Sequence, residues 1–497
     1  MKWKAVLSIL IVSFIVAACQ QTNITSRDAE AQLPSPTETA TQVMTEPPAP
    51  TEIPPTATPI PTINPETVLT LQKDSDLPMI RFYPGYGFTE SENSRIGDTF
   101  PFDPWEQPCP EFENDWVGGH IKQLGFKWVR VSIDYIELDP AREAGNFSKF
   151  EINPCHDEAI TFLYENDITI MHTIVYWDET LHADRYPSYK NEEEVQQFLD
   201  YTRMIVAAFK GRVQYYEILN EGYFYVEVED YIELIRQVIP VIREEDPAAK
   251  IVVGGTTDLM NPGMQWYIGQ VIQSDIISQV DGINLHPMYG PSPQYAETRQ
   301  YYQDYPEIIR GIQNTAGENG FAGEIFAEEM NWRTAINPHP YEIWQYSETQ
   351  AAKYYARGIV INLGLDLWAG IGGERYETIA PVVKVVQSLS NLMVGAQPDD
   401  LNVVIESESE EIVYYSFSYP NGDRIVAIWR DGVALDDDPG VAATLSIDGL
   451  SAESAVGYDI LYPFYQEIAF EMDVNGLVIR DLVVRDYPTL IRFTNSE

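Results

Sequence analysis

The sequence predicts an α/β protein that consists of a (β/α)8 TIM barrel followed by a small antiparallel β-sandwich. Two observations lead to this prediction. From about residue 66 to residue 394, short apolar β-branched runs alternate with longer amphipathic runs, which is typical of parallel strands joined by helical crossovers. Over residues 395–497 the helical period disappears, and alternating strands follow, two of them joined by a Pro420–Asp423 hairpin turn.

The N-terminal end has the features of an exported lipoprotein. Lys2 and Lys4 precede an apolar run that ends in Val16-Ala17-Ala18-Cys19, so we expect residues 1–18 to be a signal peptide. This ending resembles the bacterial lipobox, in which the cysteine is lipidated and becomes the new N-terminus. The resemblance implies that Cys19 anchors the chain to the cell membrane on its extracytoplasmic side. The alternative is an ordinary signal peptide with an incidental cysteine.

Residues 19–65 are rich in Thr and Pro and contain almost no large apolar side chain, so we expect a disordered linker there. The net charge of −45 argues against binding to nucleic acid or to an anionic membrane surface, and it is compatible with a neutral substrate. Cys109 and Cys155 form an even pair, which makes them candidates for a disulfide in an oxidising compartment. The cysteine and histidine spacing resembles no zinc or iron site, and we expect neither a metal nor a cofactor.

The predicted barrel spans residues 66–394 and contains eight strand candidates. In chain order they are Met79 to Tyr83, Lys127 to Ile133, Ile168 to Val175, Gln214 to Leu219, Lys250 to Gly254, Asp281 to His286, Glu324 to Glu328 and Leu363 to Trp368. Between the third and fourth, apolar residues from Val195 to Phe209 recur at helical spacing. A doubly wound sheet is the alternative, but polar residues follow the carboxyl ends of several strands, which favours the barrel.

The fourth strand candidate ends in Asn220-Glu221, directly after the apolar Ile218-Leu219. An Asn-Glu pair is weak evidence by itself, because Asn191-Glu192 is a second one at the start of a polar helix. The position of Asn220-Glu221 separates the two pairs, since the end of a buried barrel strand places polar side chains at the barrel mouth. We therefore expect Asn220 and Glu221 to contribute to a site.

The run Tyr216-Glu217-Ile218-Leu219-Asn220-Glu221 is similar to the fourth-strand signature of glycoside hydrolase clan A, which contains the retaining barrel glycosidases of families 39 and 5. The resemblance implies a carbohydrate substrate, with Glu221 as the catalytic acid/base. It also implies that Asn220 contacts the sugar 2-hydroxyl.

Clan A places its nucleophile at the end of the seventh strand, where this chain has Glu328 and Glu329 side by side. Alignment of Met330-Asn331-Trp332 with the end of the family pattern selects Glu329, with Glu328 as the alternative. The chemistry requires two carboxylates from separate strands, because retaining hydrolysis places them roughly 5 Å apart.

Three further positions resemble the clan. Arg130 is similar to the second-strand arginine that stabilises the charge of the nucleophile, and a barrel-lining ion pair is a compatible alternative. His286 and Tyr289 resemble the sixth-strand His and Tyr, where the tyrosine orients the nucleophile. Two residues separate them here, while relatives often have one, so the role of Tyr289 stays open.

Tryptophans supply the expected sugar-stacking surfaces. Trp368 resembles the eighth-strand tryptophan that forms the floor of the subsite for the cleaved sugar, and Trp177 and Trp332 are candidates for outer subsites. His172 lies inside the third strand candidate and is either a core histidine or a ligand contact.

The sequence therefore favours an extracytoplasmic retaining glycoside hydrolase that cleaves O-glycosidic bonds in a poly- or oligosaccharide. One alternative is a non-catalytic glycan-binding lipoprotein, which would not need two convergent glutamates. Another is a transglycosylase that uses the same residues. The sugar, the linkage and the oligomeric state are left open.

Overall fold

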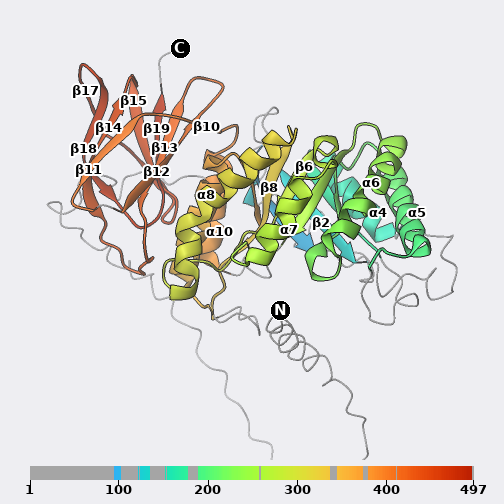
Figure 1. Cartoon of the computed structure of the whole chain (residues 1–497). Coiled ribbons are helices and arrows are strands. Elements are labelled where there is room, and N and C mark those ends of the chain that lie inside the picture. Colours follow the sequence, from blue (N-terminus) through green and yellow to red (C-terminus); the bar gives the residue numbers. More distant parts are fainter. Residues whose placement is uncertain are drawn as a thin grey trace, which may run out of the picture. The chain divides into compact units, whose positions relative to one another are not determined.

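The structure is a computed structural model that describes residues 94–101, 121, 124–134, 152, 154–176, 188–256, 259–335, 344–372, 379–409 and 411–494. Within these residues, eight parallel strands form a closed barrel (Figure 1). They are β1 (Ile96–Pro101), β2 (Trp128–Asp134), β3 (Thr169–Val175), β4 (Tyr215–Ile218), β5 (Lys250–Thr256), β6 (Gly282–Leu285), β8 (Glu324–Asn331) and β9 (Trp368–Ile371). The ring closes because β6 pairs with β8 and β9 pairs with β1. A short strand, β7 (Met288–Tyr289), also pairs with β8.

The barrel fold is confirmed, but two strand predictions need correction. The first barrel strand is β1, Ile96–Pro101, and the predicted strand Met79 to Tyr83 lies outside the described residues. The eighth barrel strand is β9, which begins at Trp368, whereas the prediction ended the strand at this residue. The prediction began this strand at Leu363, but Leu363 belongs to a helix. That helix is buried on all sides, so its sequence lacks the polar face by which a helix is recognised.

Helices connect the described strands and cover the barrel. They are α4 (Pro154–Glu165), α5 (Glu192–Phe209), α6 (Val228–Glu245), α7 (Pro262–Ile272), α8 (Ala296–Glu318), α9 (Glu348–Gly364) and α10 (Ala380–Leu392), with two short 3-10 helices, η2 (Gly222–Phe224) and η3 (Ile277–Gln279). No helix in this part of the chain combines the length and the apolar character that a membrane crossing requires.

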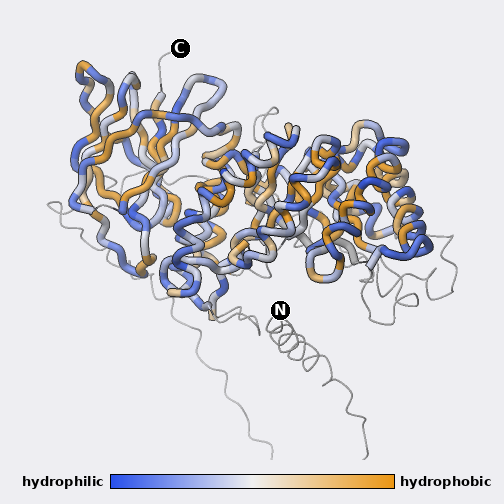
Figure 2. Tube along the Cα trace, in the orientation of Figure 1, coloured by the Kyte–Doolittle hydropathy of each residue, from blue (hydrophilic) through white to orange (hydrophobic). Residues whose placement is uncertain are grey.

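Helix α5 illustrates how the sequence specifies a covering helix. Its apolar stripe, which includes Val195, Phe198 and Phe209, is buried as predicted, and Figure 2 shows polar and apolar residues alternating along such helices. The Asn191 side chain accepts a hydrogen bond of 2.9 Å from the backbone N–H of Glu193 and caps the helix. The second Asn-Glu pair of the sequence is therefore a helix start.

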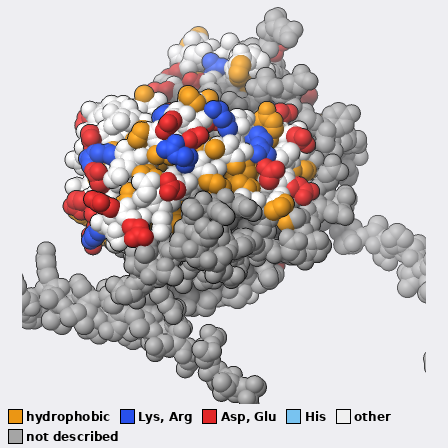
Figure 3. Space-filling view, turned by 90° about the vertical axis from the view of Figure 1, so that its right-hand side faces the viewer, with side chains coloured by type: hydrophobic (Ala, Val, Ile, Leu, Met, Phe, Trp, Pro, Cys, Tyr) orange, Lys and Arg blue, Asp and Glu red, His pale blue; other side chains and the backbone are white. Residues whose placement is uncertain are grey.

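On the helix surfaces, basic side chains pair locally with some of the many acidic ones. Arg203 on α5 lies 2.7 Å from Glu245, and Arg236 on α6 lies 2.7 Å from Asp275. Figure 3 shows basic side chains interspersed with acidic ones on one face of the molecule. Exposed pairs of this kind contribute little to stability, so the barrel owes its stability mainly to its buried apolar residues.

The residues after α10 form two antiparallel sheets. The first contains β10 (Gln397–Asp399), β12 (Ile412–Ser418), β13 (Arg424–Arg430), β19 (Thr489–Thr494), β15 (Ser454–Asp459) and β16 (Phe464–Glu467), in that order. The second contains β11 (Val403–Ser407), β14 (Val441–Asp448), β18 (Gly476–Val484) and β17 (Glu471–Met472). The β-sandwich predicted after the barrel is thereby confirmed.

Helix α9 joins the barrel to the sandwich. Its residues from Ala351 to Leu363 are all buried. The Lys353 Nζ atom lies 2.7 Å from Oδ1 of the buried Asp486, and the Arg357 guanidinium donates hydrogen bonds of 2.9 and 2.6 Å to the Asp486 carbonyl. Removal of one partner from a buried ion pair is strongly destabilising, so these contacts hold the sandwich against this side of the barrel.

His156 and His172 form a buried stacked pair between α4 and β3. Their Nε2 atoms are 3.1 Å apart and their ring centroids 5.1 Å apart. Burial, together with the neighbouring His172 and Arg212, lowers the pKa of His156 well below 6.5, and burial lowers the pKa of His172 to about 4. Both imidazoles are therefore neutral in the folded protein near neutral pH, and His172 is a core histidine.

We expect this pair to make the fold sensitive to acid. The unfolded chain protonates both imidazoles near pH 6.5 and the folded chain does not, so their contribution to stability is present above about pH 6.5 and is lost as the pH falls towards about 4. Urea unfolding of the wild type and of His172→Leu, measured at pH 7 and pH 5, checks this expectation. The variant should lose less free energy of unfolding between the two pH values; an equal loss in both proteins would contradict it.

Candidate active site

The turn after β4 holds Glu221 in a strained conformation. Tyr215–Ile218 are buried, and the chain then turns through Leu219 and Glu221, whose φ angles are 64° and 49°. Positive φ values at residues with side chains cost free energy and are often found at functional sites. The turn also packs closely on β5, since a Cβ atom at Gly255 would lie 3.0 Å from the Leu219 carbonyl oxygen and 3.2 Å from the Glu221 backbone nitrogen.

The end of β8 directs two adjacent glutamates toward the same group. Successive strand residues normally point to opposite faces, but the pairing of β8 with β9 shifts register between Ala327 and Met330. A bulge of this kind re-aims side chains, and both Glu328 and Glu329 contact the guanidinium of Arg130. Glu328 is fully buried, whereas the Glu329 side chain is 15% exposed.

Arg130, on β2, is the centre of the cluster. Its Nε lies 2.7 Å from a Glu217 oxygen and contacts Glu328, its Nη1 lies 2.8 Å from Glu329, and its Nη2 donates a 2.7 Å hydrogen bond to Oδ1 of Asn220. Burial by itself would lower the pKa of Arg130, but the carboxylates of Glu217, Glu328 and Glu329 outweigh it and raise that pKa further above its ordinary value. Arg130 is thus a permanent cation that ties the ends of β4 and β8 together.

His286, which follows β6, bridges the two expected catalytic groups. Its Nδ1 lies 3.1 Å from Oε1 of Glu221 and 3.7 Å from Oε2 of Glu329. Burial disfavours its charged form, but Glu329, Glu221 and Glu328 outweigh burial and raise the pKa of His286 to about 10. One carboxylate oxygen of Glu221, one of Glu329 and a ring nitrogen of His286 lie within 4.8 Å of one another. A buried imidazolium therefore sits beside two carboxylates from opposite strands.

The sequence analysis did not identify Glu217 as a site residue. A glutamate within an otherwise apolar strand was the signal that could have found it. It is fully buried, and it accepts a 2.6 Å hydrogen bond from the Thr173 hydroxyl. The side-chain amide of Asn284, also missed, donates to both Glu217 and Glu328. Burial raises the pKa of Glu217, opposed by Arg130 and reinforced by Glu328.

The cluster therefore has two layers. The inner layer contains Glu217 and Glu328, which are inaccessible, and the outer layer contains Glu221 and Glu329, whose side chains are 25% and 15% exposed. Both layers have spacings with His286 that would suit a metal ion. The charges of Arg130 and His286 balance part of the carboxylate charge of both layers.

Trp368 does not form the floor of the site, contrary to the sequence prediction. It begins β9, so it lies at the amino end of the barrel strands, opposite the mouth. There its ring packs against Trp128, Tyr215 and Phe326, with centroids 5.9, 6.1 and 5.2 Å away. This bottom layer fills the barrel interior, and a tryptophan in it cannot reach a substrate at the mouth.

Trp332 is not an outer subsite either. It is 1% exposed, its Nε1 donates a 2.9 Å hydrogen bond to the Pro291 carbonyl, and its ring packs on Tyr354 and Tyr355 of α9. The sequence could not show that α9 covers the residues after β8. Tyr289 is half-buried, with its ring centroid 6.3 Å from that of His286.

Three other predicted residues, Trp177, Cys19 and Cys109, lie outside the described residues. Cys155 is disulfide-bonded, and Cys109 is its predicted partner.

A family model described as cellulase (glycosyl hydrolase family 5) matches residues 87–362, more than half of the 497 residues. No curated protein matches the chain.

Three solved structures share the fold. The first is a family 39 glycoside hydrolase from Bacteroides cellulosilyticus WH2, with 14% sequence identity, a TM-score of 0.58 and coverage of 80% of this chain and 81% of that chain. The second is a family 51 arabinofuranosidase from Xanthomonas axonopodis pv. citri, with 12% identity, a TM-score of 0.53 and coverage of 81% of this chain and 97% of that chain. The third is a family 30 xylanase C from Talaromyces cellulolyticus, with 10% identity, a TM-score of 0.52 and coverage of 81% of this chain and 96% of that chain. Together with the closed barrel, the family match makes the protein a clan A glycosidase with a carbohydrate substrate. The chain therefore belongs to the cellulase family, glycosyl hydrolase family 5.

Proposed function

We propose that this glycosidase is a retaining enzyme that cleaves O-glycosidic bonds in a poly- or oligosaccharide by double displacement, and that it acts outside the cell, anchored by a lipid on Cys19. The observation that carries the mechanism is the separation of the outer glutamates. Carboxylate oxygens of Glu221 and Glu329 lie within 4.8 Å of each other, and retaining enzymes place the two groups roughly 5 to 5.5 Å apart, while inverting enzymes need roughly 6.5 Å or more.

In the first step, an oxygen of the ionised Glu329 attacks the anomeric carbon as the bond from that carbon to the leaving oxygen breaks. Protonated Glu221 delivers its proton to the leaving oxygen, which departs as an alcohol. In the second step, Glu221 takes a proton from water, the water oxygen bonds to the anomeric carbon, and Glu329 leaves as a carboxylate. Glu221 is again protonated at the end.

The position of His286 suits the way in which the negative charge moves between Glu329 and Glu221 during the two steps. Before the first step Glu329 is ionised and Glu221 is neutral, and after it Glu221 is ionised while Glu329 is bound to the sugar. The pair thus carries one negative charge at each stage, on alternate residues. The imidazolium of His286 lies 3.1 Å from a Glu221 oxygen and 3.7 Å from a Glu329 oxygen, so it stabilises the charge in both states without moving.

The stereochemistry of the product tests the mechanism. The protein is screened with nitrophenyl glycosides and polysaccharides, and the anomer first released from an active substrate is identified by proton NMR before it mutarotates. We expect the released sugar to have the anomeric configuration of the substrate. Release of the opposite anomer would refute the double displacement, and lengthened products at high substrate concentration would indicate transglycosylation through the same intermediate.

The anchor is supported by the residues before Cys19. Lys2, Lys4 and the apolar run that ends in Val16-Ala17-Ala18 match a lipoprotein leader. Expression of the full chain in a bacterium and fractionation of the cells tests this part of the proposal. The wild type should sediment with the membranes and Cys19→Ala should not, whereas an unchanged distribution would rule out anchoring through this residue.

A further inference from the structure

The buried Glu328 has a contact that neither catalytic step uses. Its Oε1 atom lies 3.6 Å from Nε2 of His286, and both side chains are fully buried. This nitrogen makes no hydrogen bond within the described part of the chain, so its interaction with Glu328 is an ion pair. The carboxylate of Glu328 is fixed by Arg130 and by a 2.7 Å hydrogen bond from the Asn284 amide. Glu328 is therefore a fixed counter-ion on the inner side of His286.

Titratable groups from four strands and their ends surround the imidazole of His286. They are Arg130 on β2, Glu217 and Glu221 in and after β4, Tyr289 on β7, and Glu328 and Glu329 on β8. Burial disfavours the imidazolium, but Glu329, Glu221 and Glu328 outweigh burial and raise the pKa of His286 to about 10. Glu329 and Glu221 change their charge during the proposed reaction. Among these three carboxylates, only Glu328 keeps one charge throughout.

The glycosyl-enzyme is the stage at which His286 can lose its charge. Glu329 is then a neutral ester, and the ionised Glu221 has an oxygen 3.1 Å from Nδ1 of the imidazolium. Transfer of the proton to this oxygen would break the Nδ1–H bond and form an O–H bond, which leaves a neutral imidazole and a carboxylic acid. A carboxylic acid cannot take a proton from the attacking water, so this transfer would stop the second step.

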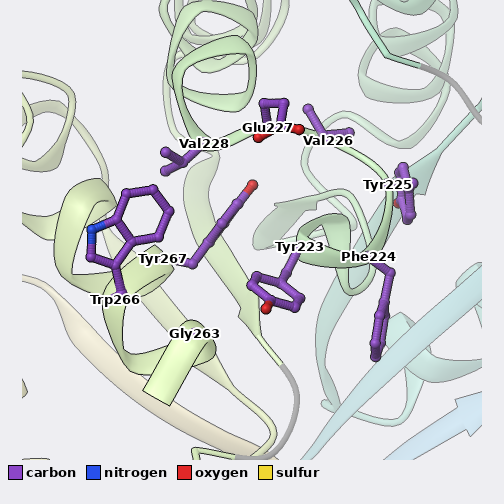
Figure 4. Close-up of a pocket in the computed structure, with 9 residues that line it drawn as sticks. All are labelled: Tyr223, Phe224, Tyr225, Val226, Glu227, Val228, Gly263, Trp266 and Tyr267. Carbon is purple, nitrogen blue, oxygen red and sulfur yellow. The ribbon is translucent and has the colours of Figure 1, made fainter. Parts of the chain in front are cut away.

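The fold keeps Glu221 close to this proton. The backbone N–H of Phe224 donates a 3.1 Å hydrogen bond to the Glu221 carbonyl, and the Tyr225 hydroxyl donates a 2.8 Å hydrogen bond to the Asn220 carbonyl. Both aromatic residues belong to the wall of a pocket formed by the residues that follow the turn (Figure 4). These bonds hold the backbone of the turn in place, so the proton must be kept on His286 by electrostatic means and not by distance.

From these contacts we propose that Glu328 is a positioning residue, which keeps the proton on Nδ1 of His286 and thereby keeps Glu221 a base in the second step. The inference rests on the proposed double displacement by Glu221 and Glu329. The charge of Glu328 attracts the imidazolium but not the neutral imidazole, and burial leaves this attraction weakly screened by water and salt. Transfer of the proton to Glu221 is therefore unfavourable as long as Glu328 is ionised.

Pre-steady-state kinetics of Glu328→Gln test the proposal. The substrate is a dinitrophenyl glycoside of a sugar that the wild type hydrolyses; the burst of phenol reports the first step, and the steady state after it reports the second. We expect the second step to slow about 10- to 100-fold, toward the loss of about 10² to 10⁴-fold that removal of the base itself produces. The first step should change less, so that the glycosyl-enzyme accumulates and KM falls together with kcat. Equal losses in both steps would overturn the proposal.

The pH dependence of the second step distinguishes control of a proton from a merely structural role. In Glu328→Gln, the inactive pair is a neutral His286 beside a protonated Glu221. Higher pH removes the proton from Glu221 and restores the base, so the rate of the second step should rise between about pH 6 and pH 9. In the wild type the base is already present, and this rate should stay constant. A variant slowed by the same factor at every pH would contradict the proposal.

Glu328→Asp is the matched control, because it keeps the charge and changes only the length of the side chain. It should recover most of the rate of the second step, and a loss as large as that of Glu328→Gln would overturn the proposal. Azide needs no base, so it should restore turnover of Glu328→Gln with retained configuration; a variant that azide does not rescue would also overturn it. In a His286→Gln background, Glu328→Gln should no longer slow the second step selectively. A selective loss there would show that Glu328 does not act through His286.

A measurement on the wild type does not depend on how well the variants fold. The glycosyl-enzyme is trapped with a 2-deoxy-2-fluoro glycoside, and imidazole nitrogen NMR, assigned with His286→Gln, reports the charge of His286. We expect an imidazolium near neutral pH. A neutral ring in the trapped enzyme would overturn the proposal.

The outcomes also separate this inference from the proposed mechanism. Release of the inverted anomer by the wild type would refute the double displacement, and the inference with it. A Glu328→Gln enzyme without a phenol burst would make Glu328 the nucleophile, which would overturn both the assignment of Glu329 and the inference. A retaining wild type, combined with equal losses in both steps of Glu328→Gln, would overturn the inference alone.

Discussion

Glu329→Gln should abolish turnover, with a fall in kcat/KM of at least about 10⁴-fold, while Glu328→Gln should retain measurable activity. The reason is access. Glu328 is fully buried and pairs with Arg130 and Asn284, whereas the side chain of the outer Glu329 is 15% exposed and a carboxylate oxygen of it lies within 4.8 Å of one of Glu221. An amide at position 329 keeps the shape of the side chain but cannot form the glycosyl ester. Without this intermediate the second step, its hydrolysis, cannot take place.

Chemical rescue decides between the two glutamates. Azide added to Glu329→Ala should enter the space left by the carboxylate and attack the anomeric carbon of a nitrophenyl glycoside, which gives a glycosyl azide of inverted configuration. Glu328→Ala should give no such product. If the two variants behaved in the opposite way, Glu328 would be the nucleophile and the assignment from the outer layer would be wrong. Thermal unfolding of both variants separates loss of chemistry from loss of fold.

Glu221→Gln should produce a loss that depends on the leaving group. General acid–base catalysis contributes about 10² to 10⁴-fold, and a phenol that leaves readily as an anion does not need the proton. We therefore expect the rate of the first step to be close to that of the wild type for a dinitrophenyl glycoside and to fall by that factor for an oligosaccharide. Pre-steady-state release of the phenol measures this step directly.

The second step is affected whatever the leaving group, because Glu221 must also deprotonate the attacking water. Glu221→Gln should therefore accumulate the glycosyl-enzyme, which intact-protein mass spectrometry detects as one added sugar on the enzyme. Azide, which needs no deprotonation, should restore turnover of the Glu221→Ala variant with retained configuration. A uniform loss on all leaving groups would assign Glu221 to binding instead.

The turn after β4 was predictable because several local signals agree there. The apolar run up to Leu219 indicated a buried strand, and Asn220-Glu221 followed it directly. In the structure this sequence forms a buried strand and a turn with positive φ at Glu221. Arg130 and His286 were also predicted. Arg130 contacts Glu329, and His286 contacts both outer glutamates.

The predicted subsite roles of Trp368 and Trp332 were wrong, and helix α9 accounts for both errors. The sequence places a residue relative to a strand only as accurately as it places the ends of that strand, and a fully buried helix such as α9 lacks the period that would separate it from β9. Trp368 therefore seemed to end a strand that it begins. Trp332 seemed to be exposed after β8, because nothing in its local sequence indicates that α9 covers it.

The sequence by itself determined the alternation of strands and helices, and thereby the barrel, because apolar periodicity is a local property that each segment carries. It also determined that Glu221 stands at a strand end. Only the tertiary structure distinguishes Glu328 from Glu329 by accessibility, since a shift in register at β8 turns both toward Arg130 and leaves only Glu329 partly exposed. The protonation of His286 depends on the tertiary structure too: burial lowers the pKa of its imidazole, but Glu329 and Glu221, which are far from it in sequence, outweigh burial and raise that pKa to about 10.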